Sequence, residues 1–156
     1  MPDNQSLSVY TVNAFTDKPF GGNPAAVVPL EVPLSDQLMQ AIAAQHNLSE
    51  TSFLEQLGPD HYRLRWFTPV NEVPLCGHAT LASAFALCHS GAWQSDRLCF
   101  ETASGQLWVS RSGTTFSIDF PAVFMVNVPV SDALARALGV NIFGAYRPQE
   151  KAWQMV

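Results

Sequence analysis

The sequence has few positive charges and few cysteines. Among its 156 residues are eight lysines and arginines and 13 aspartates and glutamates, which gives a formal net charge of −5. The basic residues are scattered, so neither nucleic acid nor an anionic membrane is an expected partner. The three cysteines include no C-x-x-C pair, and their odd number favours a reduced, cytoplasmic protein over a disulfide framework.

Long apolar runs and cofactor motifs are also missing. No run reaches the roughly 18 apolar residues of a membrane-spanning helix, and the first ten residues do not have the pattern of a secretory signal. The four histidines are not at metal-ligand spacing from the cysteines, so no zinc site is expected. Without a phosphate-binding loop, no organic cofactor is expected either.

Apolar side chains are abundant, at 47% of the sequence against 13% charged residues. This composition is typical of a globular protein with a well-buried core. Residues 34–47 predict an amphipathic helix with Ser35 as its N-cap and Asn47 at its left-handed end. Alternating and β-branched patterns predict seven strands before residue 122, at residues 7–15, 25–30, 50–57, 62–68, 97–102, 105–111 and 114–121.

A second helix is predicted from Gly77 to about Ser90, and its apolar residues occur on all sides. Such a helix needs to be enclosed. The economical packing is an α+β fold in which a curved mixed β-sheet wraps around this central buried helix.

After Pro121 the strand and helix pattern starts again. Strands are predicted at residues 124–130, 142–148 and 151–156, with a capped helix at 131–139. We therefore expect a first domain at 1–121 and a second unit at 122–156. Since the sequence stops within an apolar run, we expect that second unit to be incomplete, and a terminal arm packed on the first domain is the alternative.

Three long motifs resemble the phenazine-biosynthesis PhzF-like proteins. They are VNAFTDKPFGGNPAAVV at residues 12–28, HNLSETSFL at 46–54 and LRWFTPVNEVPLCGHATLA at 64–82, and SGQL at 104–107 also fits. The resemblance covers about residues 8–120. It implies the diaminopimelate-epimerase fold, in which two similar halves enclose an active site, and a cofactor-independent isomerase activity. The second half's catalytic aspartate and Gly-Ser loop have no counterpart in this sequence.

Glu50 is the predicted catalytic residue. Taken alone, the S-E-T sequence is more typical of a surface glutamate that begins a strand. The resemblance implies that Glu50 is the general acid/base that moves a proton between substrate carbons. A carboxyl group at the end of apolar elements can take up and return a proton near neutral pH.

Gly77 and His78 are predicted to bind the substrate. They begin the buried helix, whose free N–H groups suit a carboxylate, and a glycine lets a ligand approach the backbone. The resemblance implies substrate contact for both residues, with a capping role as the alternative for His78. Thr80 in the first helical turn is a weaker candidate. Asn23 is predicted either to contact substrate or only to form an Asn-Pro turn.

Cys76 is the alternative catalyst. Racemases and epimerases of the same fold place a thiol acid/base directly before a similar Gly-Asn or Gly-His pair, and a helix N-terminus is expected to depress the pKa of such a thiol.

These features predict an isomerase that shifts a proton and a double bond on a small carboxylate substrate of unknown identity. The alternatives are a thiol-based amino-acid racemase or epimerase, and a non-catalytic half-domain that self-associates. A homodimer is expected because two copies could face each other across a two-fold axis.

Overall fold

The computed structural model describes residues 6–120, 122 and 124–149. It divides the chain into two compact units, Met1–Phe120 and Pro121–Val156. Whether the second unit is the beginning of a longer half-domain stays a prediction. None of the helices among the described residues is both long enough and apolar enough to cross a membrane.

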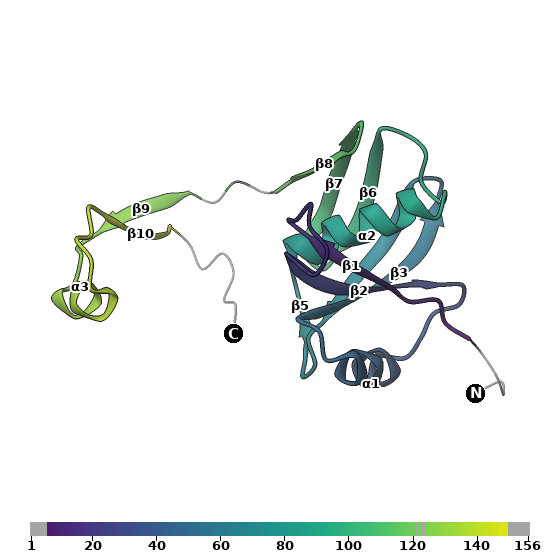
Figure 1. Ribbon diagram of the computed structural model, residues 1–156, viewed down its shortest axis with the longest axis horizontal. Helices are drawn as coiled ribbons and strands as arrows, with labels where there is room; N and C mark the ends of the chain where they lie inside the picture. Colours follow the sequence, from purple (N-terminus) through teal and green to yellow (C-terminus); the bar gives the residue numbers. More distant parts are fainter. Residues whose placement is uncertain (1–5, 121, 123, 150–156) are drawn as a thin grey trace. The chain divides into compact units, whose positions relative to one another are not determined.

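The first unit is built on one mixed sheet of eight strands (Figure 1). Seven strands follow the order β1-β2-β3-β4-β6-β7-β8, and β5 pairs with β4. The pairs β2/β3 and β4/β6 are parallel, and the other pairs are antiparallel. The strands are β1 (Tyr10–Ala14), β2 (Asn23–Leu30), β3 (Glu50–Gly58), β4 (His61–Phe67), β5 (Glu72–Val73), β6 (Arg97–Thr102), β7 (Gly105–Ser112) and β8 (Thr115–Asp119).

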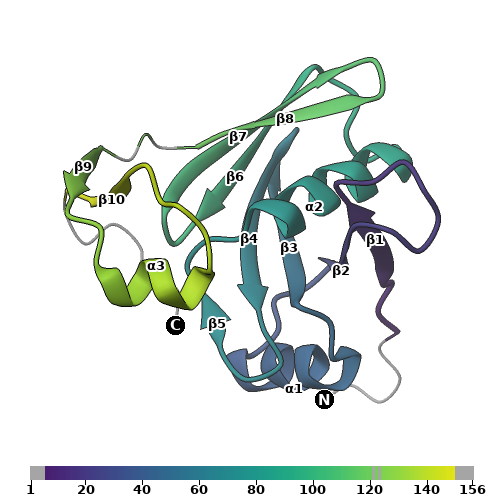
Figure 2. The ribbon, with the colours of Figure 1, turned by 60° about the vertical axis from the view of Figure 1, so that its left-hand side comes forward.

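Each parallel pair is joined through a helix, because parallel strands need a crossover connection. Helix α1 (Asp36–His46) links β2 to β3, and α2 (Gly77–His89) follows β5 on the way from β4 to β6. Figures 1 and 2 show α2 lying along the curved sheet, with α1 on the sheet's other face. The predicted α+β fold, a curved mixed sheet around a central helix, is confirmed.

The two helices divide the core between the two faces of the sheet. Neighbouring residues Val27 and Val28 are both fully buried, yet Val27 belongs to the cluster around α2 and Val28 to the cluster around α1. Because successive strand residues point to opposite faces, this places apolar side chains on both sides of β2. The α1 cluster is completed by Met39, Ala43, Phe53 and Phe67.

Helix α2 is less enclosed than its sequence predicts. Most of its residues are buried, but Phe85 is 45% exposed and stacks on the exposed ring of His89, with centroids 5.9 Å apart. The expectation that α2 is buried on every side is therefore wrong for the side that carries Phe85 and His89. An apolar pattern shows that a helix prefers burial, whereas the curvature of the sheet decides how much of its circumference is covered.

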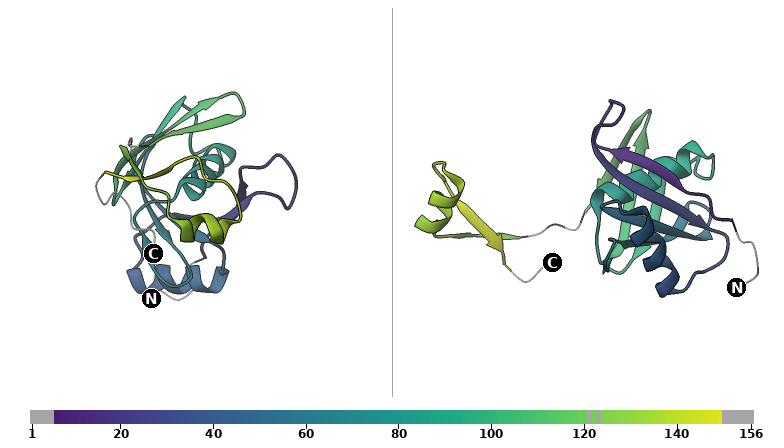
Figure 3. Two further views of the ribbon diagram at one scale, coloured as in Figure 1. Left: turned by 90° about the vertical axis from the view of Figure 1, so that its left-hand side faces the viewer. Right: turned by 60° about the horizontal axis from the view of Figure 1, so that its bottom comes forward.

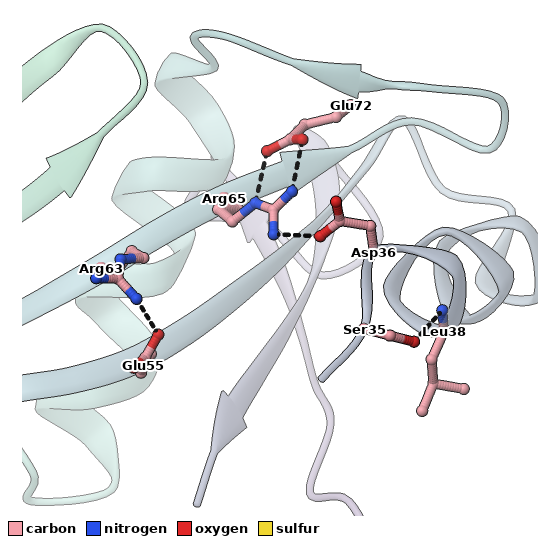
Figure 4. Close-up of polar contacts among 7 residues, drawn as sticks. All are labelled: Ser35, Asp36, Leu38, Glu55, Arg63, Arg65 and Glu72. Atoms are coloured by element: carbon pink, nitrogen blue, oxygen red, sulfur yellow. Dashed lines mark hydrogen bonds and ion pairs between the residues drawn. The ribbon is translucent and has the colours of Figure 1, made fainter. Parts of the chain in front are cut away.

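The caps predicted for α1 are present. The Ser35 side chain accepts a hydrogen bond from the Leu38 N–H at 3.3 Å, and Asn47 has a left-handed φ of 51°. Strand β5 was not predicted, because two residues give no periodic pattern. It is joined to β4 by Arg65, whose guanidinium makes two 2.7 Å hydrogen bonds to Glu72 and a third, also 2.7 Å, to Asp36 of α1 (Figure 4).

The second unit contains β9 (Met125–Val128), α3 (Asp132–Leu138) and β10 (Ala145–Pro148) (Figure 3). The two strands pair antiparallel, and α3 has a Ser131 N-cap and a left-handed Gly139 at its end. No residue of α3 is buried. The strand predicted at residues 151–156 lies outside the described residues.

Candidate functional site

Three predicted side chains meet at the N-terminus of α2. Glu50 is the first residue of β3, while Cys76 is the N-cap of α2 and His78 its second residue. His78 Nε2 lies 3.2 Å from Glu50 Oε2, and His78 Nδ1 lies 3.3 Å from Cys76 Sγ. His78 therefore stands between a carboxylate and a thiol.

The topology explains why these segments meet. In the antiparallel β3/β4 pair, Thr51 near the start of β3 lies opposite Phe67 at the end of β4. The chain thus leaves β4 at the end of the sheet where β3 begins, and α2 starts there after the short strand β5. The same end holds the start of β2, because Ala25 is paired in parallel with Glu50.

The contact between Glu50 and His78 is close, but it is not aligned as a hydrogen bond. Glu50 Oε2 and His78 Nε2 are both buried and have no hydrogen-bond partner among the described residues. Only 9% of the His78 side chain and 19% of the Glu50 side chain are exposed. A buried polar atom without a partner costs roughly 1–3 kcal/mol, and such atoms in native proteins call for an explanation. Within the described residues, each atom is left without the hydrogen bond that a buried polar atom ordinarily makes.

His78 is held in its neutral form. Burial lowers its pKa from the ordinary value of 6.5, and this effect outweighs the Glu50 carboxylate and the Pro24 carbonyl, which both raise it. A neutral imidazole offers one donor and one acceptor nitrogen. His78 can therefore either donate to a substrate oxygen or accept a proton.

Cys76 does not have the depressed pKa expected of a thiol at a helix N-terminus. Burial raises its pKa from 9.0 to about 12, and the negative charge of Glu50 adds to the increase. The sequence-based expectation was wrong because only 8% of Cys76 is exposed, so the loss of hydration outweighs the effect of the helix end. At neutral pH Cys76 is a thiol and not a thiolate.

The first turn of α2 is suited to an anion. Cys76 makes no side-chain capping bond, and the turn contains no acidic residue. The first N–H groups of a helix lack intrahelical partners and carry partial positive charge. Thr80, in contrast, is fully buried, and its hydroxyl donates to the Cys76 carbonyl at 2.5 Å. A substrate contact for Gly77 or Thr80 stays a prediction.

Asn23 and Ser104 hold the two segments that meet at the site. The Ser49 hydroxyl, just before Glu50, donates to Asn23 Oδ1 at 3.3 Å. The Ser104 hydroxyl, in the turn between β6 and β7, donates to the Pro74 carbonyl at 2.6 Å, two residues before Cys76. Sequence reasoning did not identify this contact. Only the match of the SGQL motif marked the turn.

Two groups of side chains have the donor atoms to hold a metal ion. One is Glu50, Cys76 and His78, and the other is His61, Cys99 and Glu101; within each group the donor atoms lie within 4.8 Å of one another. The sequence-based expectation of no zinc site rested on spacing along the chain and did not anticipate these groups. Strand pairing places His61 beside Cys99, which sequence spacing cannot reveal. The second group also forms an ion pair, because His61 Nε2 lies 3.1 Å from Glu101 Oε1.

Glu50, Cys76 and His78 lie apart from a hollow of about 550 Å³ beside the C-terminal end of α2, which is lined by Leu87, Ser90 and Ala92 among others. Glu50, Cys76 and His78 are not among its lining residues. The titratable groups and the unpartnered polar atoms therefore favour the N-terminal end of α2 as the functional site.

Comparison with known proteins gives the same family over most of the chain. Residues 12–142 match the family model PhzC-PhzF, described as phenazine biosynthesis-like protein. An uncharacterized isomerase of Pseudomonas aeruginosa is 51% identical over 134 residues, which cover 86% of this chain and 51% of that protein. The chain spans about half the length of the curated relatives it matches.

Solved structures agree with this match. A crystal structure of a PhzF-family phenazine biosynthesis protein from Enterococcus faecalis has a TM-score of 0.86 and 43% identity, and the match covers 91% of this chain and 54% of that chain. A structure described as a predicted epimerase from Pseudomonas aeruginosa has a TM-score of 0.66 and 27% identity, with 82% and 47% covered. Both support the epimerase-like α+β fold.

Proposed function

Because the chain belongs to the PhzC-PhzF family of phenazine biosynthesis-like proteins, we propose that it provides the acid/base half of an isomerase active site. The substrate class is a small molecule that carries a carboxylate. Glu50 is the acid/base, and the start of α2 binds the carboxylate. No metal or organic cofactor takes part in the proposed reaction.

One observation supports this proposal above the others. The Glu50 carboxylate lies against the neutral imidazole of His78, and each presents a buried polar atom that has no hydrogen-bond partner among the described residues. Pairs of this kind cluster at functional sites, because unpartnered groups are destabilising unless a ligand uses them. Their position beside free helix N–H groups favours an anionic ligand.

The proposed reaction conserves protons and electrons. The Glu50 carboxylate removes a proton from a substrate carbon, and the electron pair of that C–H bond moves into a new double bond. The electron pair of the original double bond then takes a proton at a second carbon from the protonated Glu50. No oxidant or reductant is needed. His78 and the Gly77 N–H hold the substrate carboxylate during the transfer.

The thiol mechanism has less support. A racemase that used Cys76 would need a substantial thiolate population near neutral pH. The pKa of about 12, to which burial and the nearby Glu50 charge both contribute, leaves Cys76 protonated there. We therefore assign the proton transfer to Glu50 and expect Cys76→Ser to keep most of the activity.

The proposed active site needs a second wall in addition to the residues at the start of α2. The relatives are about twice as long as the matched region, and the resemblance places the active site between two halves. A second wall could come from further residues of such a protein or from a second copy of this chain. If a second copy supplies the wall, light scattering should give the molecular mass of a dimer. A monomer mass at high protein concentration would contradict this arrangement.

The test is deuterium incorporation from D₂O into a panel of small unsaturated carboxylic acids, followed by proton NMR. We expect Glu50→Gln to lower the incorporation at least a hundredfold while leaving acetate binding within about threefold. Glu55→Gln is the matched control, because Glu55 lies on the same strand and pairs with Arg63 instead. Incorporation at the wild-type rate in Glu50→Gln would refute the assignment.

A further inference from the structure

We propose that Phe120 determines which carboxylates the site accepts, because its ring lies over the first residue of α2. This inference rests on the proposed function, since it concerns the same anion-binding helix end. Phe120 directly follows β8 and belongs to the first unit. Nothing in the sequence pattern distinguishes it from a residue at the end of a strand.

The geometry places the tip of the ring against Gly77. A Cβ atom added at Gly77 would lie 3.0 Å from Phe120 Cζ and 3.6 Å from Cε2. The first of these distances is shorter than ordinary van der Waals contact between carbon atoms. Glycine therefore lets the Phe120 ring approach the helix backbone at the position where a carboxylate would reach the free N–H groups.

The ring is not simply part of the core. Phe120 is 46% exposed, whereas core aromatic residues such as Phe53 and Phe100 are at most 2% exposed. One part of the ring contacts the start of α2 and another part remains accessible. An apolar ring in this position accepts a compact carboxylate beside it and obstructs one with a bulky branched substituent next to the carboxyl carbon.

The ring and the polar groups have complementary roles. His78, the residue after Gly77, is nine-tenths buried, and its Nε2 has no hydrogen-bond partner among the described residues. His78 and the N–H groups recognise the charge of the ligand, whereas Phe120 restricts its size. A hydrophobic contact of this kind discriminates between ligands by about 10- to 200-fold.

The experiment compares acetate with pivalate, which have the same charge at pH 7 and differ in bulk. Each is titrated into the ¹⁵N-labelled chain while the Gly77 and His78 amide signals are followed. In the wild type we expect acetate to bind at least tenfold more tightly than pivalate. In Phe120→Ala we expect the two dissociation constants to differ by less than threefold.

Phe124→Ala is the control, because it also removes an exposed phenylalanine, 76% exposed, four residues further along the chain. It should keep the wild-type preference. An unchanged preference in Phe120→Ala, with acetate still shifting both amides, would overturn the role of Phe120 and leave the anion site intact. If acetate shifts neither amide signal in any variant, the anion site itself is refuted. The part of the proposed function that assigns carboxylate binding to the start of α2 is then refuted as well.

A second measurement does not depend on ligand. Gly77→Ala should lower the Tm because its new methyl group meets the Phe120 ring. The same substitution in a Phe120→Ala background should lower the Tm by less than half as much. An equal loss in both backgrounds would show that the ring does not occupy the start of α2.

Discussion

Glu50 Oε2 lies 3.2 Å from His78 Nε2, at the point where the first residue of β3 meets the second residue of α2. The two residues are 28 positions apart in the chain, and the pairing of β2, β3 and β4 together with the packing of α2 on β2 and β3 brings them together. The two atoms do not form an aligned hydrogen bond. Their proximity couples the charge of one residue to the protonation of the other.

This coupling predicts the response of His78 to a change at Glu50. The Glu50 carboxylate raises the pKa of His78 and partly offsets the effect of burial. Glu50→Gln removes that charge, so the pKa of His78 should fall further below 6.5. An NMR titration of the His78 ring signals measures this. Glu55→Gln should leave the titration unchanged, and an unaltered His78 midpoint in Glu50→Gln would show that the two groups are not coupled.

Cys76 predicts a loss of stability at alkaline pH. Its pKa is about 12 in the folded protein and 9.0 ordinarily. Above pH 9 the unfolded chain releases a proton that the folded protein keeps, so the free energy of unfolding falls as pH rises. For Cys76 alone the loss is on the order of 2–3 kcal/mol between pH 9 and pH 11.

Urea unfolding of the wild type and of Cys76→Ala across this pH range tests the effect. The wild type should lose stability more steeply than the variant, because alanine has no proton to release. Cys88→Ala is the control, since Cys88 is only partly buried and accepts a hydrogen bond from Arg111. Equal slopes for the wild type and Cys76→Ala would contradict the raised pKa.

Adding a single methyl group at Gly22 should strongly lower the free energy of unfolding. Gly22 precedes Asn23 at a φ of +74°, and an added Cβ would collide with the Ala14 carbonyl and lie 2.8 Å from Thr16 Cγ2. The left-handed backbone alone costs roughly 1–2 kcal/mol for a residue other than glycine. The collision adds to this, so Gly22→Ala should lower the free energy of unfolding by at least about 3 kcal/mol.

Gly113→Ala separates the two contributions. Gly113 also has a positive φ, of +60°, but a Cβ there would meet nothing within 4 Å. Its substitution should cost only the backbone part, about 1–2 kcal/mol. Similar unfolding midpoints in urea for the two variants would show that the backbone of the β1–β2 connection shifts to relieve the collision at little cost in stability.

Local signals in the sequence predicted the individual elements well. Ser35 and Asn47 cap α1 as expected, because capping depends on residues within one or two turns. The strands from β1 to β8 were predicted from alternating and β-branched patterns, except for the two-residue β5. The open stripe at Phe85 was not predicted, because its exposure depends on how far the sheet curves.

The sequence selected residues that the structure brings together, but their roles in a site stay predictions. The motifs selected Glu50, Gly77 and His78, and the fold brings these segments to one end of α2. The state of Cys76 was wrongly predicted, because burial outweighs the helix end in setting its pKa. Ser104 and Phe120 were overlooked because their partners, Pro74 and Gly77, are distant in sequence.

The sequence by itself therefore determined the elements and the family and selected the candidate site residues, because those follow from local patterns and motifs. The tertiary structure decided which groups meet, which are deprived of water and which side chain covers the helix end. Those properties arise from strand pairing and burial between distant segments. Hydration and distance set the pKa values and the access of a ligand, and neither can be read from the order of the residues.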